Sequence, residues 1–241
     1  MTTLHAEWTK VRTVPGTVWL LVGVVALTVS LGALVAGAMP AGGDPAKSAL
    51  TGVLAGQAIV VLLGVGTISG EYGTGMITTT FAALPRRLEV LAAKAFVVAG
   101  LVMAAGAVAV LGSALVGNAL LPDGLPLTGP VVRAATGSVL YLALIAVLGV
   151  GVAALVRDAA AAVGLALGLL YLTPIIASLV SDPTWNDRLR TWSPMIAGRA
   201  IQSTVDLDAE PVAPWAGLGV LAIWAAGALV AGGLTLRLRD A

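Results

Sequence analysis

The chain has 241 residues, of which 59% are hydrophobic and 10% are charged, and its formal net charge at pH 7 is +1. With a mean hydropathy of +1.01, a soluble globular fold would lack the polar surface to cover itself, so the composition indicates an integral membrane protein. The near-neutral charge gives no indication of a nucleic-acid partner or an acidic substrate. The absence of cysteine excludes disulfides and thiol chemistry, and the single histidine, His5, leaves no histidine-rich metal or catalytic site.

The N-terminal region begins with a short amphipathic pattern. Residues 2–14 place Leu4, Trp8 and Val11 on one helical face before proline and glycine interrupt the pattern at positions 15 and 16. We predict an interfacial helix here, with a frayed polar N-terminus as the alternative.

The first apolar run, residues 17–39, is long enough to cross a bilayer, which takes about 20 residues in a helix. Its end, Ala36-Gly37-Ala38, has the small residues of a signal-peptidase site. The run is longer than the apolar core of a signal peptide, which is about 7 to 15 residues, so we predict a retained membrane span.

Six segments in all are long and apolar enough to span a membrane. We predict them at residues 17–39, 50–68, 91–118, 134–156, 159–180 and 215–236. Arg157-Asp158 makes a tight charged connection between the fourth and the fifth, and residues 118–130 form a turn-rich loop. The predicted fold class is therefore all-α: one polytopic transmembrane domain over residues 1–241 with six transmembrane helices.

Residues 69–94 are the main polar interruption in the first half of the chain. A helix over about residues 74–84 would put three apolar side chains on one stripe and small or hydroxyl side chains on the other. The apolar stripe consists of Ile77, Phe81 and Leu84. Glu71 would lie just before the N-terminus of this helix, where the helix dipole favours a carboxylate. We predict a short amphipathic helix at the membrane surface that presents one face to a soluble partner.

The basic residues predict the orientation of the bundle. With the N-terminus inside, eight of them face the cytoplasm: Lys10, Arg12, Arg86, Arg87, Lys94, Arg157, Arg237 and Arg239. The outer connections hold Lys47 and Arg133, with three further arginines in the longest loop, where basic residues weigh less. We therefore expect a multi-pass protein of the inner (plasma) membrane with both termini cytoplasmic.

Residues 181–214 form the longest polar stretch, and two interpretations stay open. Trp185 and Trp192 suit the aromatic belt of a membrane interface, and the sequence after Trp192 is semi-apolar. These features fit a re-entrant or surface-lying outer helix pair before the sixth span. An ordinary exposed loop is the alternative.

Chemical motifs are missing from the chain. Residues 46–48 end like a nucleotide-binding loop, but Ala46 stands where that loop needs glycine. The signatures of zinc proteases, serine hydrolases and intramembrane aspartyl proteases are absent. No Asp, Glu, Lys or Arg lies in the middle of a predicted span, which counts against an ion-coupled carrier. Gln57 and Ser113 are the few deep polar side chains, and we expect them to bond between helices rather than to contact a substrate.

Four stretches together resemble the ABC type-2 exporter permeases. Residues 71–87, Glu-Tyr-Gly-Thr-Gly-Met-Ile-Thr-Thr-Thr-Phe-Ala-Ala-Leu-Pro-Arg-Arg, look like the family's cytoplasmic segment, with Lys94 soon after. Residues 7–13 resemble its N-terminal helix, residues 149–163 its connection between spans four and five, and residues 192–198 its outer segment before span six. The likeness touches the whole length of the chain, in the order that the family has.

The resemblance implies a permease half that works with a second permease subunit, identical or different, and two cytoplasmic ATPase subunits. ATP and Mg²⁺ would bind to the ATPase, so this chain would hold no cofactor and would not be an enzyme. In the family the segment between spans two and three is a coupling helix that docks in the ATPase. Carried onto this chain, the candidate contacts are Glu71, Tyr72, Thr74, Arg86 and Arg87. Anchoring of Arg86 and Arg87 to anionic headgroups is the alternative for the basic pair.

A substrate path at a permease dimer interface would be lined largely by apolar side chains. The expected cargo is therefore hydrophobic or amphipathic: drug-like, peptide or lipid-like. Two other classes stay open. The chain could be a non-transporting scaffold or sensor subunit, or a secondary transporter or channel, and the missing mid-membrane charges weaken the last of these.

Overall fold

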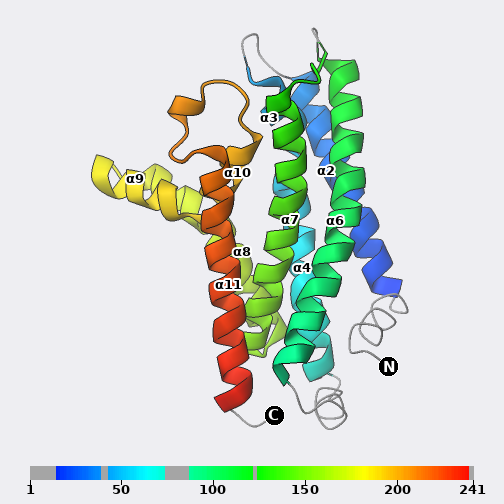
Figure 1. Cartoon of the computed structure of the whole chain (residues 1–241), viewed down its shortest axis with the longest axis vertical. Helices are drawn as coiled ribbons and strands as arrows, with labels where there is room; N and C mark the ends of the chain where they lie inside the picture. Colours follow the sequence, from blue (N-terminus) through cyan, green and yellow to red (C-terminus); the bar gives the residue numbers. More distant parts are fainter. Residues whose placement is uncertain (1–14, 39–42, 74–86, 122–123, 239–241) are drawn as a thin grey trace.

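The computed structural model describes residues 15–38, 43–73, 87–121 and 124–238 (Figure 1). Within these ranges there is no strand, and six helices are long and apolar enough to cross a membrane. They are α2 (Pro15–Gly37), α4 (Val53–Gly73), α6 (Arg87–Leu120), α7 (Gly129–Val156), α8 (Ala159–Leu179) and α11 (Pro214–Leu238). The prediction of an all-α, multi-pass membrane protein is confirmed. The interfacial helix predicted at residues 2–14 lies outside the described residues.

The helices agree with the predicted spans in number and order but differ in where they begin and end. The second span starts later than predicted because α3 (Pro45–Ala49) is a separate short helix, capped by the Asp44 side chain. It also runs further, to Gly73. The third and fourth begin earlier, at Arg87 and Gly129. Hydropathy marks only the apolar part of a helix. The helix itself can extend past that part, because each further residue adds a backbone hydrogen bond.

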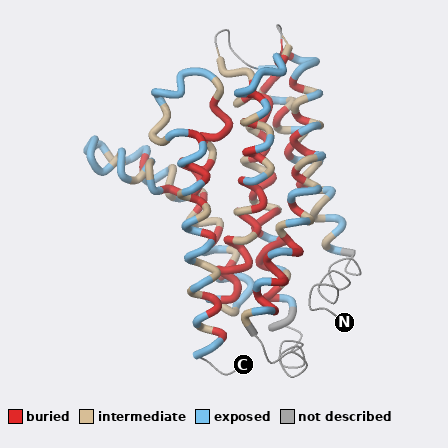
Figure 2. The backbone as a smooth tube through the Cα atoms, in the orientation of Figure 1, coloured by how far each residue is buried: buried red, intermediate tan, exposed pale blue. Residues whose placement is uncertain are grey.

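The six helices alternate in direction, so their ends gather at two poles of the bundle (Figure 1). We call one pole the α3 end; it holds α3 and residues 199–213. We call the other the Arg157 end; it holds the α7–α8 turn, the end of α4, the start of α6 and the end of α11. Helix α7 lies at the centre and packs against α4, α6, α8 and α11. It is the most buried of the six, and α2 and α8 are the least (Figure 2).

Helices α7 and α11 pack closely at a glycine of each helix, Gly151 and Gly232. A Cβ atom placed on Gly151 would lie 2.6 Å from the carbonyl carbon of Ala228, and one on Gly232 would lie 2.7 Å from the carbonyl oxygen of Gly151. Neither contact leaves room for a methyl group. Small residues at helix contacts are typical of membrane bundles, where close backbone approach increases van der Waals contact.

The α7–α8 connection matches the predicted tight charged turn. Arg157 ends α7 with a left-handed backbone (φ 64°), and Asp158 accepts a hydrogen bond from the Ala161 N–H at 2.7 Å, capping α8. The Arg157 guanidinium donates to the Thr235 carbonyl of α11 at 3.0 Å. The turn therefore also holds the end of α11 in place.

Residues 181–213 form a helix pair, and the exposed-loop alternative is wrong for their central part. Helix α9 (Pro183–Trp192) projects sideways from the bundle (Figure 1). Helix α10 (Pro194–Arg199) and the 3-10 turn η1 (Ala200–Gln202) then return into the bundle and are largely buried there. A second 3-10 turn, η2 (Leu207–Ala209), precedes α11.

Candidate functional site

The residues predicted to contact an ATPase map to the Arg157 end as far as they are described. Glu71 and Tyr72 lie in the last turn of α4, and Arg87 is the first residue of α6. Thr74 and Arg86 lie outside the described residues, as does the predicted amphipathic helix at residues 74–84. The placement of Glu71 just before the N-terminus of that helix therefore stays a prediction. In the described structure Glu71 belongs to the C-terminal turn of α4, where the dipole of α4 does not favour a carboxylate.

Helices α4 and α6 lead directly from this segment into the bundle. Each is a single uninterrupted helix, and the 21 residues of α4 correspond to a length of about 31 Å. The buried Lys94 of α6 donates to the Thr67 carbonyl of α4 at 3.4 Å. Further along, a Cβ atom on Gly64 would lie 2.6 Å from the Ala146 carbonyl oxygen, so α4 is seated tightly on α7. A force applied between Gly73 and Arg87 would act on both helices.

Near the other end of α4, a group of hydrogen-bonded side chains holds α10 in the bundle. We call it the inner polar cluster: Gln57, Ser138, Tyr141, Met195 and Gln202. The fully buried Tyr141 hydroxyl donates to the Gln57 side-chain carbonyl, and the Gln57 amide donates to the Met195 sulfur at 3.4 Å. The Gln202 amide donates to the Ser138 hydroxyl at 3.1 Å.

The inner polar cluster confirms what we expected of Gln57. It bonds between helices, and the same holds for Ser113 of α6, which donates to the Thr28 carbonyl of α2 at 3.2 Å. Sequence reasoning missed Tyr141 and Gln202. A tyrosine inside an apolar run is a signal for a buried hydrogen bond, because its hydroxyl needs a partner away from water. Nothing in the sequence names that partner.

At the α3 end, Asp44 joins the first connection of the chain to the segment before α11. Its carboxylate accepts from the Thr204 and Val205 backbone N–H groups at 2.5 and 3.0 Å and from the Thr204 hydroxyl at 2.6 Å. It also accepts from the Lys47 N–H at 3.0 Å. One side chain thus caps α3 and holds residues that are 160 positions away in the sequence.

Glu210 makes the second contact of this kind. Its carboxylate accepts from the Lys47 ammonium at 2.5 Å and from the Ser203 hydroxyl at 2.5 Å. The Arg133 guanidinium of α7 donates to the Ser203 carbonyl, also at 2.5 Å. We call these contacts of Asp44 and Glu210 the outer clamp.

The outer clamp lowers the pKa of both of its carboxyl groups. Partial burial alone would raise the pKa of Asp44, but the hydrogen bonds from residues 204, 47 and 205 outweigh it. Partial burial would likewise raise the pKa of Glu210, and the hydrogen bonds and positive charges around it, chiefly from Lys47 and Ser203, outweigh that. Both groups are therefore ionised at neutral pH, and the clamp is closed by charge-assisted hydrogen bonds.

Among the described residues, no group of three or more His, Cys, Asp or Glu side chains comes together as a cluster of possible metal ligands. The outer clamp brings together two carboxylates and a lysine, and the Lys47 ammonium occupies the place of a cation. Its geometry suits a closed contact between two loops rather than ligand binding.

Comparison with protein-family models gave no match to the chain, and neither did comparison with curated proteins. The functional argument therefore rests on the residues and on their arrangement in the bundle.

Proposed function

We propose that this chain is the transmembrane permease subunit of an ATP-binding-cassette exporter. It moves a hydrophobic or amphipathic substrate outward with ATP hydrolysed by a separate ATPase subunit. The observation that carries the proposal is that two uninterrupted spanning helices have neighbouring ends at one pole: α4 ends at Gly73 and α6 begins at Arg87, at the pole that also holds the α7–α8 turn. Residues 74–86 connect these two ends in the sequence. A soluble partner bound there acts on two spans at once.

Helix α4 supplies a mechanical route from that partner to the opposite end of the bundle. Its last turn carries Glu71 and Tyr72, and its first turns carry Gln57, which is bonded to Tyr141 and Met195. Closure of the ATPase tilts α4 and pulls on the contacts that hold α10. The outer clamp lies at the same pole as α10, so its opening accompanies that movement. Substrate release then follows at the α3 end.

The orientation in this proposal puts the Arg157 end in the cytoplasm. Arg87, Lys94, Arg157 and Arg237 all belong to that pole, at the start of α6, the α7–α8 turn and the end of α11. The α3 end combines its basic residues with the acidic Asp44 and with the carboxylates of residues 206–210. Basic residues close to helix ends favour the cytoplasmic side.

The working unit consists of this chain, a second permease subunit and two ATPases that bind ATP and Mg²⁺. Helices α2 and α8 are the least buried of the spans, which leaves them free to face a second subunit or the bilayer. Most of their exposed side chains are apolar: on α8 these include Leu165, Leu172 and Leu179. An apolar surface of this kind suits lipid-like, peptide or drug-like cargo.

The test is co-purification of the tagged chain in mild detergent from its native cell. Wild type is compared with Glu71→Ala and with the double variant Arg86→Ala/Arg87→Ala. Arg188→Ala/Arg190→Ala is the matched control, because it removes two arginines from α9, away from the Arg157 end. We expect an ATPase subunit to accompany wild type and the control and to be lost or reduced with the other two. A wild-type dimer that brings down no ATPase contradicts the exporter and favours the scaffold or sensor alternative.

A further inference from the structure

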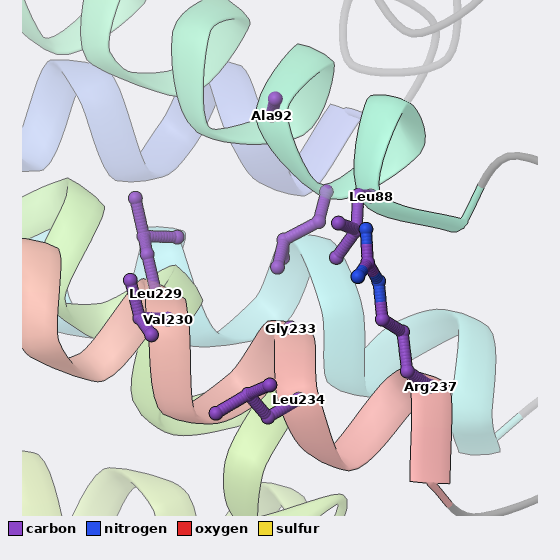
Figure 3. Close-up of a pocket in the computed structure, with 8 residues that line it drawn as sticks. Leu88, Ala92, Leu229, Val230, Gly233, Leu234 and Arg237 are labelled. Atoms are coloured by element: carbon purple, nitrogen blue, oxygen red, sulfur yellow. The ribbon is translucent and has the colours of Figure 1, made fainter.

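A groove separates the start of α6 from the end of α11 at the Arg157 end (Figure 3). Its volume is about 280 Å³. Leu88, Leu91 and Ala92 of α6 form one wall, and Val230 and Gly233 belong to the other. Gly233 is buried, and a Cβ atom there would lie 2.9 Å from the Leu88 side chain, so α6 and α11 touch at this point of the groove. The walls are apolar along their length.

One lining residue is charged. Arg237 lies at the end of the groove nearest the α11 terminus, and its side chain extends toward Leu88 of α6 (Figure 3). It is exposed. A guanidinium group presents several N–H donors in a planar fork that matches the oxygens of a phosphate group. Apolar walls with a phosphate-binding group at one end match the two chemical parts of a phospholipid.

The position of Arg237 along the helices fits the depth of a phospholipid headgroup. Helix α6 begins one residue before Leu88, and α11 ends one residue after Arg237. The groove therefore opens where the spanning helices end, at the level where the hydrocarbon core gives way to headgroups. In the sequence, Arg86 and Arg87 directly precede Leu88, and Arg239 follows α11. Basic pockets between spanning helices are suited to anionic headgroups.

We infer that this groove binds one anionic phospholipid, with an acyl chain against the apolar walls and the phosphate on Arg237. A free phosphate ion would leave the apolar walls without a role. An apolar helix from a second copy of the chain would leave the Arg237 guanidinium without a partner. The bound lipid braces the first turn of α6 against the last turns of α11. This inference does not depend on the exporter function.

The experiment uses the full chain purified in detergent and equilibrated with equimolar phosphatidylglycerol and phosphatidylcholine. Mass spectrometry of the intact protein measures the lipid that each variant retains. We expect wild type to retain phosphatidylglycerol in preference. Arg237→Gln should lower that retention about fivefold, because a basic residue near an anionic headgroup contributes about 1 kcal/mol. Val230→Trp should lower retention of both lipids by filling the groove.

Two matched controls separate the groove from general effects. Arg190→Gln removes an arginine from α9. Val108→Trp enlarges a valine of α6 that does not line the groove and that is 58% exposed, a fraction close to the 62% of Val230. Both should retain lipid as wild type does. Equal retention of the two lipids by wild type overturns the inference, and so does an Arg237→Gln effect no larger than that of Arg190→Gln. If Val230→Trp changes the dimer fraction and leaves lipid retention unchanged, the groove binds a second copy instead.

Discussion

The hydrogen bond between Tyr141 and Gln57 should be measurable as a coupling between α7 and α4. Tyr141→Phe removes the donor and leaves the Gln57 side-chain carbonyl in a fully buried position. An unpaired buried polar group costs about 1 to 3 kcal/mol. In membrane proteins the net contribution of such a bond averages about 0.6 kcal/mol and reaches about 1.7, because the unfolded chain finds other partners.

We therefore expect Tyr141→Phe to reduce the free energy of unfolding by about 1 to 2 kcal/mol. Gln57→Leu should cost a similar amount, since it strands the tyrosine hydroxyl and removes the donor to Met195. The double variant should lose about 0.6 to 1.7 kcal/mol less than the sum of the two. The difference between the summed losses of the two single variants and the loss of the double variant is the coupling energy of the Tyr141–Gln57 bond.

Reversible unfolding in lipid-detergent mixtures, followed by tryptophan fluorescence, measures all four proteins of the cycle. The control cycle pairs Gln57→Leu with Thr136→Ala, because the Thr136 hydroxyl bonds only within α7. That cycle should be additive. If the Tyr141 and Gln57 effects are also additive, the bond does not hold α4 to α7, and only the contact of Gln57 with Met195 then supports the proposed route from α4 to α10.

Two further outcomes follow from close packing and from the outer clamp. Gly232→Val should lower the melting temperature and the yield of folded protein, because the valine side chain would meet the Gly151 carbonyl oxygen. Gly219→Val is the control, since nothing lies within 4 Å of a Cβ atom at that position. Equal effects of the two would refute the α7–α11 contact. The pKa of Asp44 lies below its ordinary value of 3.8, so the clamp is fully stabilising above about pH 4 and weakens as the pH falls through the lower, folded value. Hydrogen exchange of the amides of residues 204–205, corrected for intrinsic rates, should show that their protection is lost as the pH falls through the folded pKa of Asp44. Asp44→Asn should reduce the same protection at neutral pH. Protection that changes neither with pH nor with this substitution would contradict the clamp.

Features that depend on neighbouring residues alone were predicted well from the sequence. The six spans follow from runs of apolar side chains, since a bilayer admits only segments that satisfy their own backbone. The Arg157-Asp158 turn follows from a charged break between two such runs. The second span was predicted to end too early, at residue 68 instead of Gly73, for a reason of the same local kind: continuation of the α4 helix past its apolar run leaves no mark in hydropathy.

Contacts between distant parts of the chain needed the tertiary structure. The sequence marks Asp44 as a polar loop residue, but only the fold brings Thr204 to it. It marks Gln57 as a deep polar side chain, but only the packing of α7 and α10 shows that Tyr141 and Met195 pair with it. The groove beside Arg237 likewise needs α6 and α11 together. A backbone hydrogen bond or a hydrophobic run is set within a few residues, whereas the partner of a buried polar group depends on how whole helices pack.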